Sequence, residues 1–213
     1  GIHRDHEFNG DPSPYTALGN FEGIKAAVKH QLKKSNLAGI SVAVQGVGNV
    51  GMELTKLLSQ ADARVYVADV NEDNLTRAKD RYGAIIVDTT KIHRLDVDVF
   101  APCAMGGTIN SMSIQEIRAS IIAGAANNQL STPDIAETAR QQGILYAPDY
   151  VINAGGIIDI HHQQTGNRNV EQVRQQVTAI GETLESIFCR AQSSQIPTSV
   201  IADQIAEEIF LAP

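Results

Sequence analysis

The chain has 213 residues with 43% hydrophobic content and a formal net charge of −7, which allows one large domain with a substantial core. The acidic balance, the absence of a Lys/Arg block and the lack of a long apolar run argue against nucleic acids and membranes as partners. Two cysteines are too few for a disulfide framework, so the cytoplasm is the expected location.

Apolar runs that predict β-strands alternate with amphipathic segments that predict helices over the first two thirds of the chain. A Pro/Gly-rich opening loop at 9–15 leads into a helical pattern that starts at Thr16. The strand-like runs lie at 40–46, 64–70, 84–88, 97–103, 121–127 and 144–149. The helical segments between them lie near 50–60, 71–82, 113–119 and 133–142. This alternation indicates parallel pairing through right-handed crossovers, with helices on both faces of the sheet.

Beyond residue 150 the strand pattern stops, and helices are predicted at 151–163, 170–192 and 197–210. The predicted fold is therefore α/β: a doubly wound, mostly parallel sheet of the Rossmann type with extra C-terminal helices. We expect a single domain over 1–213, with the βα core at 14–150 and the C-terminal helices at 151–213. Because the chain opens on Gly1 and a loop-like segment, we also expect it to be one domain of a longer protein.

The stretch VAVQGVGNVGMEL contains a glycine pattern that is typical of dinucleotide-binding loops. Gly46, Gly48 and Gly51 follow a predicted strand and open a predicted helix in the spacing G-x-G-x-x-G. In such a loop the glycines admit a tight turn and a close pyrophosphate, and the helix N-terminus supplies N–H donors. Asp69 ends the next strand, where a carboxylate accepts ribose hydroxyls and repels a 2′-phosphate, which favours NAD over NADP. The alternative is a structural strand–turn–helix unit without a ligand.

Three later strands end in small or amide-bearing residues, at the edge of the sheet where ligands of this fold bind. FAPCAMGG surrounds Cys103, GAANNQL carries Asn127, and YAPDYVINAGG leads into Asn153. Side-chain amides offer both donors and acceptors, which suits a nicotinamide carboxamide or a substrate carboxylate. Each of these strand ends, taken singly, is also explained as a turn that an Asx side chain caps.

Neither the cysteines nor the histidines form a pattern that predicts covalent or metal chemistry. Cys103 has no His neighbour in the sequence and is expected to be a buried, unreactive cysteine, while Cys189 is expected to be a core residue on a helix face. The six histidines show no metal-ligand spacing, and His161 and His162 are interpreted as a solvated pair at a helix end. No metal site is predicted.

These motifs, in this order, resemble the glutamate/leucine/phenylalanine/valine dehydrogenases, and most of all the leucine type. The likeness covers roughly residues 9–210 and is carried by GDPSPYTALG, VAVQGVGNVG, FAPCAMGG, GAANNQL, LYAPDYVINAGGIID, NRNVEQVRQQV and IPTSVIADQIAEEIF. It implies reversible, NAD-dependent oxidative deamination of an L-amino acid to a 2-oxo acid and ammonia. It implies a substrate or nicotinamide contact for Asn127. It also implies cofactor-binding roles for Gly46, Gly48, Asn49, Val50, Gly51, Asp69, Thr16, Cys103, Ala104 and Asn153.

The resemblance further implies a part that this chain lacks. In the family the catalytic lysines and an aspartate lie in a separate N-terminal substrate domain, with one lysine in a glycine-rich stretch. Here the last lysine is Lys91, and no lysine has a glycine-rich setting. We therefore expect the catalytic residues to lie outside this chain, which alone should bind NAD without turnover. The full-length protein is expected to be a homo-oligomer that acts on a small amino-acid substrate.

Two other functions are compatible with parts of the sequence. A non-catalytic NAD-sensing module would explain the glycine loop and the missing lysines, but it gives no reason for the amide-bearing strand ends. A dehydrogenase of 2-hydroxy acids would require a catalytic His–acid pair, which we do not find. In VINAGG, Gly155 and Gly156 are interpreted as backbone that passes close to a nicotinamide ribose, with close helix-on-sheet packing as the alternative for Gly156.

Overall fold

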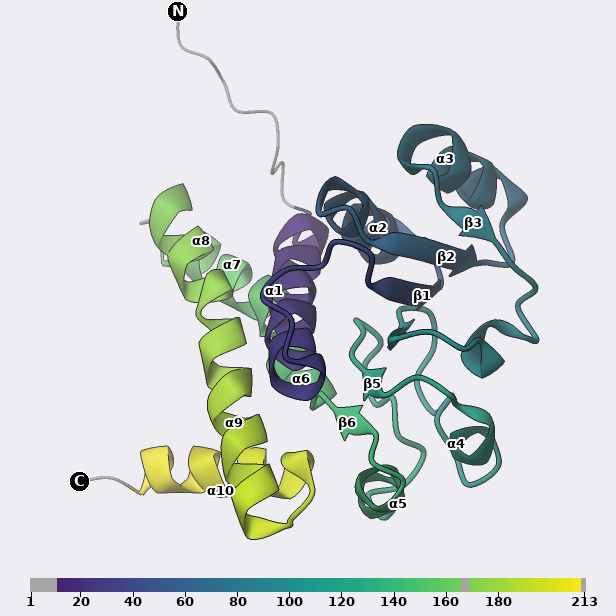
Figure 1. Ribbon diagram of the computed structural model, residues 1–213. Coiled ribbons are helices and arrows are strands. Elements are labelled where there is room, and N and C mark those ends of the chain that lie inside the picture. The colour runs from purple at the N-terminus through teal and green to yellow at the C-terminus, as the bar shows by residue number, and fades with distance from the viewer. Residues whose placement is uncertain (1–10, 166–168, 212–213) are drawn as a thin grey trace, which may run out of the picture.

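The computed structural model describes residues 11–165 and 169–211, and a six-stranded sheet forms its centre (Figure 1). The strands are β1 (Ser41–Gln45), β2 (Arg64–Ala68), β3 (Ile85–Ile86), β4 (Val99–Pro102), β5 (Ile121–Ile122) and β6 (Leu145–Tyr146). They pair in the order β3-β2-β1-β4-β5-β6, and every neighbouring pair is parallel. The order reverses between β1 and β4, which confirms a doubly wound sheet of the Rossmann type.

Helices cover both faces of the sheet, so the strands bury side chains on each side. Along β1, Val42 and Val44 belong to one buried cluster and Ala43 belongs to the other, as alternation along a strand requires. The first cluster includes residues of α1 (Ser13–Leu32), α2 (Asn49–Gln60) and α3 (Glu72–Tyr82), together with residues of the C-terminal helices. Three shorter ones contribute to the second: η1 (Ile92–Arg94), α4 (Ser113–Glu116) and α5 (Ile135–Gln141). This double coverage is why the strand sequences are almost wholly apolar.

The C-terminal third is helical and packs against α1, which lies between these helices and the sheet (Figure 1). Its helices are α6 (Asp149–Ile152), α7 (Ala154–Gln164), α8 (Val170–Thr178), α9 (Ile180–Ser194) and α10 (Thr198–Phe210). Leu184 and Phe188 of α9 are fully buried in the same cluster as Val42 and Val44 of β1. The predicted C-terminal helices therefore extend the core of the first face.

Helix α1 begins earlier than the sequence predicted. Residues 13–15 were assigned to the opening loop, but they form the first turn of α1. Asp11 Oδ1 accepts the Ser13 N–H at 2.9 Å, and Pro14 is tolerated in a first turn, where its missing N–H has no intrahelical acceptor. Residues 9 and 10 of the predicted loop lie outside the described residues.

Two predicted helices are each divided into two. The segment 151–163 is interrupted at Asn153, whose ψ of 0° departs from helical geometry, and 170–192 is interrupted at Ala179, with ψ −12°. Three predicted strands, 84–88, 121–127 and 144–149, are reduced to two residues each. After β5 the chain turns away, and the Ala126 N–H bonds to the Pro102 carbonyl at 2.9 Å. Hydrophobic pattern marks these segments as buried but does not mark where the backbone turns.

Cys189 lies on the exposed side of α9, so the prediction that it is a core residue is wrong. The buried face of α9 includes Leu184, Ile187 and Phe188, and the position after Phe188 is rotated out of that face. Among the two histidines predicted as a solvated pair, His161 is exposed and His162 is half-buried, with its Nε2 2.9 Å from Gln176 Oε1.

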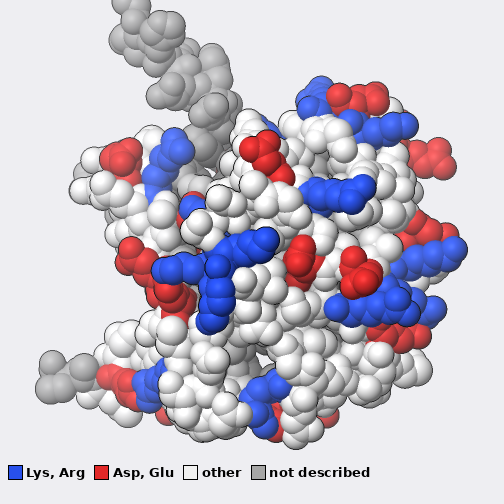
Figure 2. Space-filling view, in the orientation of Figure 1, with Lys and Arg blue, Asp and Glu red and all other residues white. Residues whose placement is uncertain are grey.

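The described surface carries charges of both signs. Figure 2 shows Lys and Arg interspersed with Asp and Glu over one face. Some of these charges form ion pairs, such as Lys29 Nζ with Glu185 Oε1 at 2.7 Å. Interspersed charges of this kind produce no single-sign field over that face. Within residues 11–165 and 169–211, no helix combines the length and the apolar character that crossing a bilayer requires.

Candidate functional site

A glycine-rich loop joins β1 to α2 at the carboxyl edge of the sheet. Gly46 has φ +95°, in the left-handed region, and a Cβ there would lie 2.7 Å from Ala104 Cβ. A Cβ on Gly51 would overlap the Gly46 carbonyl oxygen. The first and third glycines of the motif are therefore required by the fold itself, because the turn and the helix–strand contact leave no room for a side chain.

Gly48, the middle glycine, has a different environment. No described atom lies within 4 Å of a Cβ built on it, and its φ of −67° suits any residue. Gly48 is the N-cap of α2, and the N–H groups of Asn49, Val50 and Gly51 precede the first helical bond, from Met52 N to Gly48 O at 2.9 Å. Open space in front of helix N–H donors fits an anionic group such as a pyrophosphate.

Asp69 follows β2 and points back to the glycine loop. Its Oδ2 accepts the Val47 N–H at 2.7 Å, and its Oδ1 accepts the Asn71 N–H at 2.8 Å. The two bonds fix the carboxylate beside the loop, and each oxygen keeps a lone pair for a hydroxyl donor. The next residue, Val70, is 94% exposed and adds an apolar surface at this edge that the sequence pattern did not reveal.

Cys103 and Ala104 follow β4 and lie against the same loop. The Cys103 N–H donates to Gln45 O at 2.7 Å, and Ala104 borders Gly46. Burial raises the pKa of the Cys103 thiol to about 12, and this effect exceeds the opposing effect of a hydrogen bond with the Ala125 backbone. A thiol that stays protonated is a poor nucleophile, so its role here is packing against the core.

We expect alkylation to distinguish the two thiols of the folded protein. Iodoacetamide at neutral pH should label the exposed Cys189 and spare Cys103, whose thiol is protonated. Peptide mass spectrometry would measure the label at each position, and a denatured sample, in which both should react, is the control. Rapid labelling of Cys103 in the folded chain would contradict its protonated state.

Asn153 connects three segments in the other half of this edge. Its Nδ2 donates to Ala125 O at 3.0 Å and lies 3.3 Å from Asn127 Oδ1, and its Oδ1 accepts from Asn20 Nδ2 at 2.8 Å. Asn127 is exposed, whereas Asn20 is fully buried on α1. Asn20 was not predicted from the sequence, where its signal is an amide within a helix that is otherwise packed in the core.

The loop that carries Asn127 is fixed by hydrogen bonds from Gln129, another residue that the sequence did not predict. Gln129 is fully buried, and its Nε2 donates to Gly124 O at 2.7 Å and to Ala126 O at 3.0 Å. A Cβ on Gly106 would lie 2.5 Å from Asn127 O, so the loop after β4 lies directly against the loop after β5. The two strand ends therefore form one continuous surface.

Thr16 lies beside α7, and the two glycines of VINAGG account for this contact. A Cβ on Gly156 would lie 2.5 Å from Thr16 Oγ1, and a Cβ on Gly155 would overlap the carbonyl oxygen of Tyr15. Both glycines are buried. Their missing side chains are explained by close approach of α7 to α1, so the interpretation of this pair as cofactor-facing backbone is wrong, and the packing is helix-on-helix instead of helix-on-sheet.

The structure places the predicted site residues along the carboxyl edge of the sheet. N–H donors and open space at Gly48 suit an anion, the Asp69 carboxylate suits hydroxyl donors, and the Asn127 amide suits a polar planar group. Within residues 11–165 and 169–211, no group of three His, Cys, Asp or Glu side chains is arranged to hold a metal ion. The chemistry that this edge can provide is binding and orientation of a polar ligand.

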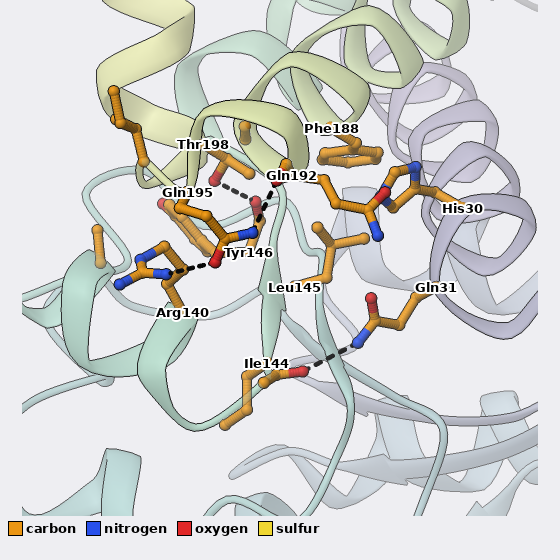
Figure 3. Close-up of a pocket in the computed structure, with 14 residues that line it drawn as sticks. His30, Gln31, Arg140, Ile144, Leu145, Tyr146, Phe188, Gln192, Gln195 and Thr198 are labelled. Carbon is orange, nitrogen blue, oxygen red and sulfur yellow. Dashed lines mark hydrogen bonds between the residues drawn. The ribbon is translucent and has the colours of Figure 1, made fainter.

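A cavity of about 210 Å³ lies away from this edge, beside the amino end of β6 (Figure 3). Several of its polar side chains are already paired: Gln31 Nε2 donates to Gly143 O at 2.9 Å, and Arg140 donates to Gln195 Oε1 at 3.3 Å. Arg140 also forms an ion pair with Glu137 at 2.7 Å. None of the predicted site residues lines this cavity.

The sheet order and the glycine loop at its carboxyl edge define a Rossmann-type α/β protein. Comparison with known proteins identifies the family, because the model of the Glutamate/Leucine/Phenylalanine/Valine dehydrogenases matches residues 67–206. The chain belongs to the glutamate/leucine/phenylalanine/valine dehydrogenase family, as its motifs predicted.

Individual relatives support this membership over almost the whole chain. Leucine dehydrogenase of Geobacillus stearothermophilus is 42% identical over 98% of this chain and 56% of its own length. L-tryptophan dehydrogenase of Nostoc punctiforme is 44% identical over 95% of this chain and 57% of its own length. The crystal structure of L-tryptophan dehydrogenase from Nostoc punctiforme matches with a TM-score of 0.90 and 45% identity, over 92% of this chain and 60% of that one. The chain thus spans little more than half the length of these relatives.

Proposed function

We propose that this chain is the NAD-binding part of an L-amino-acid dehydrogenase of the leucine type. The full-length protein would oxidise an L-amino acid to a 2-oxo acid and ammonia, and NAD supplies the hydride acceptor when it is bound. One observation carries the proposal: the open space in front of Gly48 lies at the N-terminus of α2, and Asp69 is hydrogen-bonded to the same loop. Family membership and dehydrogenase relatives support the reaction class.

The residues of this edge fit the parts of NAD. The N–H groups of Asn49, Val50 and Gly51 would bind the pyrophosphate, with Gly46 and Gly48 keeping the approach clear. The Asp69 carboxylate would accept the hydroxyls of the adenosine ribose, and the exposed Val70 would support the adenine ring. Thr16, Cys103, Ala104 and Asn153 would border the nicotinamide half, and Asn127 would contact the nicotinamide or the substrate.

Helix α7 offers an apolar surface next to the proposed position of the nicotinamide half of NAD. Ile157 and Ile160 are 72% and 41% exposed, and they continue the side of α7 that Asn153 begins, because residues three to four positions apart share a helix face. Exposed isoleucines near the polar strand ends suit the side chain of an apolar amino acid. This surface favours an apolar L-amino acid over a charged one as the substrate.

The catalytic groups are proposed to lie in another part of the full-length protein. Hydride transfer from an amino acid needs a group that activates water and a cation for the carboxylate. The lysines end at Lys91, and they lie on α1, α2 or α3, in the loop after α1, or directly before η1, and none lies in the loop that carries Asn127. The isolated chain should therefore bind NAD without oxidising leucine, and the full-length protein should assemble as a homo-oligomer. Leucine oxidation by the isolated chain would overturn the proposal that the catalytic groups lie elsewhere in the full-length protein.

Calorimetric titration tests the cofactor. The chain should bind NAD, and it should bind NADP at least about tenfold more weakly, because a 2′-phosphate would meet the Asp69 carboxylate. Asp69→Asn removes the charge, so the preference for NAD over NADP should fall by about tenfold. Asp73→Asn makes the same charge change at an exposed position in the first turn of α3 and should leave the preference unchanged. Tighter binding of NADP than NAD by the unmodified chain would refute the assignment.

A further inference from the structure

Three asparagines from different parts of the chain form a line of amides that runs from the core to the surface. Asn20 Nδ2 donates to Asn153 Oδ1 at 2.8 Å, and Asn153 Nδ2 lies 3.3 Å from Asn127 Oδ1. Exposure increases along the line: Asn20 is fully buried, Asn153 is half-buried and Asn127 is exposed. The line therefore ends on the surface that faces the proposed nicotinamide half of NAD.

The buried end of the line has a fixed orientation. Asn20 Nδ2 faces three oxygen acceptors, namely Thr16 O at 2.9 Å, Ile152 O at 3.4 Å and Asn153 Oδ1 at 2.8 Å. Reversing the amide would place its oxygen against these three oxygens. Asn20 Oδ1 is buried and has no hydrogen-bond partner among the described residues, an unfavourable arrangement that is rare in folded proteins. Because the unpaired Asn20 oxygen costs stability, packing alone does not explain an asparagine at this position.

The orientation of Asn20 determines that of the next two amides. Because Asn153 Oδ1 accepts from Asn20, its Nδ2 is directed to the loop after β5, where it also donates to Ala125 O at 3.0 Å. The same Nδ2 group faces Asn127 Oδ1, so the oxygen of Asn127 accepts a hydrogen bond from the core side. The Asn127 Nδ2 group, which is a donor, takes no part in this bond and is left for a ligand.

We propose that Asn20 is a positioning residue: it orients Asn153 and Asn127 so that the Asn127 amide presents N–H donors to the carboxamide oxygen of the nicotinamide ring. This inference rests on the proposed function, since it requires NAD at the carboxyl edge of the sheet. Asn20 itself touches no ligand, because it is fully buried beneath Asn153. Its effect on the cofactor passes through two side-chain hydrogen bonds.

The test compares NAD with ADP-ribose, which has the pyrophosphate and both riboses but lacks the nicotinamide ring. In Asn20→Leu, which keeps the approximate shape and removes the donor, NAD should bind about tenfold more weakly while ADP-ribose binds as before. Asn127→Ala should reduce the NAD/ADP-ribose affinity ratio by a similar factor. In the double variant the reductions should not add, because both act through one donor.

Two further variants keep the inference testable if Asn20→Leu does not fold. Asn20→Asp preserves the shape, and its carboxyl, whose pKa burial should raise, regains a donor when protonated. Its NAD/ADP-ribose ratio should therefore rise towards that of the unmodified chain in mildly acidic buffer, whereas the unmodified chain should show no such change. Val28→Ala removes buried volume two turns along α1 and should lower the melting temperature without changing the ratio.

The possible outcomes separate this inference from the proposed function. Equal weakening of NAD and ADP-ribose in the Asn20 variants would overturn the inference and leave a purely structural role for Asn20. An unchanged ratio in these variants, or additive effects with Asn127→Ala, would overturn it as well. Failure of the unmodified chain to bind either ligand would instead refute the proposed function.

Discussion

Gly48→Ala should leave the protein folded and greatly weaken its binding of NAD. No described atom lies within 4 Å of the added methyl group, and φ −67° is favourable for alanine, so the melting temperature should be unchanged or slightly raised. The methyl group would occupy the space in front of the first N–H groups of α2, where we propose that the pyrophosphate binds. We expect NAD affinity to fall at least about tenfold in calorimetry, since several hydrogen bonds to the phosphates would be lengthened.

Gly51→Ala is the matched comparison within the same loop. Its methyl group would overlap the Gly46 carbonyl oxygen, so β1 and α2 must separate, and overpacking of this kind typically lowers the free energy of unfolding by about 1–3 kcal/mol. Gly51→Ala should therefore lower the melting temperature, whereas Gly48→Ala should lower only the affinity. Normal NAD binding by Gly48→Ala would contradict the placement of the pyrophosphate at α2.

The fold could be predicted because its main signals are local. The glycine spacing at 46–51 and the acidic residue at the end of the next strand lie within one βαβ unit, and that unit has nearly the same geometry wherever it occurs. A doubly wound, mostly parallel sheet followed from the alternation of strands and helices, and the observed sheet is of this kind. The fold class and the glycine loop could therefore be predicted, because both depend on residues that are close in the sequence.

The features that the sequence did not predict depend on contacts between distant segments. Asn20 and Asn153 are 133 positions apart, so no local pattern indicates that their amides meet. Gln129 likewise acts on carbonyl groups of a loop whose shape is not encoded by hydrophobic period. The division of helix 151–163 at Asn153 belongs to the same class, because Asn153 leaves helical geometry where its side chain bonds to both α1 and the loop after β5.

The glycine pair in VINAGG illustrates what a sequence can and cannot specify. Two adjacent glycines in an apolar segment indicate that something excludes side chains there, and both positions are indeed packed closely. The sequence does not identify the excluding group, which is the first turn of α1 and not the cofactor. Helices that approach so closely need glycine at the contact, since one Cβ is enough to separate their backbones.

Gly155→Ala should therefore destabilise the protein, although alanine is the better helix former. Alanine gains up to about 1 kcal/mol over glycine within a helix. Here the added methyl group would overlap the Tyr15 carbonyl oxygen, which is backbone and cannot rotate away, so α7 must shift from α1. Overpacking should outweigh propensity and lower the free energy of unfolding by about 2 kcal/mol. Urea unfolding would measure this as a lower midpoint with an unchanged slope.

Gly156→Ala is the control that tests whether overlap with the α1 backbone, and not alanine in α7 as such, destabilises Gly155→Ala. Its methyl group would lie 2.5 Å from Thr16 Oγ1, a side-chain atom that can rotate to another χ1 well. The loss of stability should therefore be smaller than for Gly155→Ala, even though the two glycines are adjacent and both buried. If the two variants unfolded at the same urea concentration, contact between α7 and the α1 backbone would not be what excludes side chains at this motif.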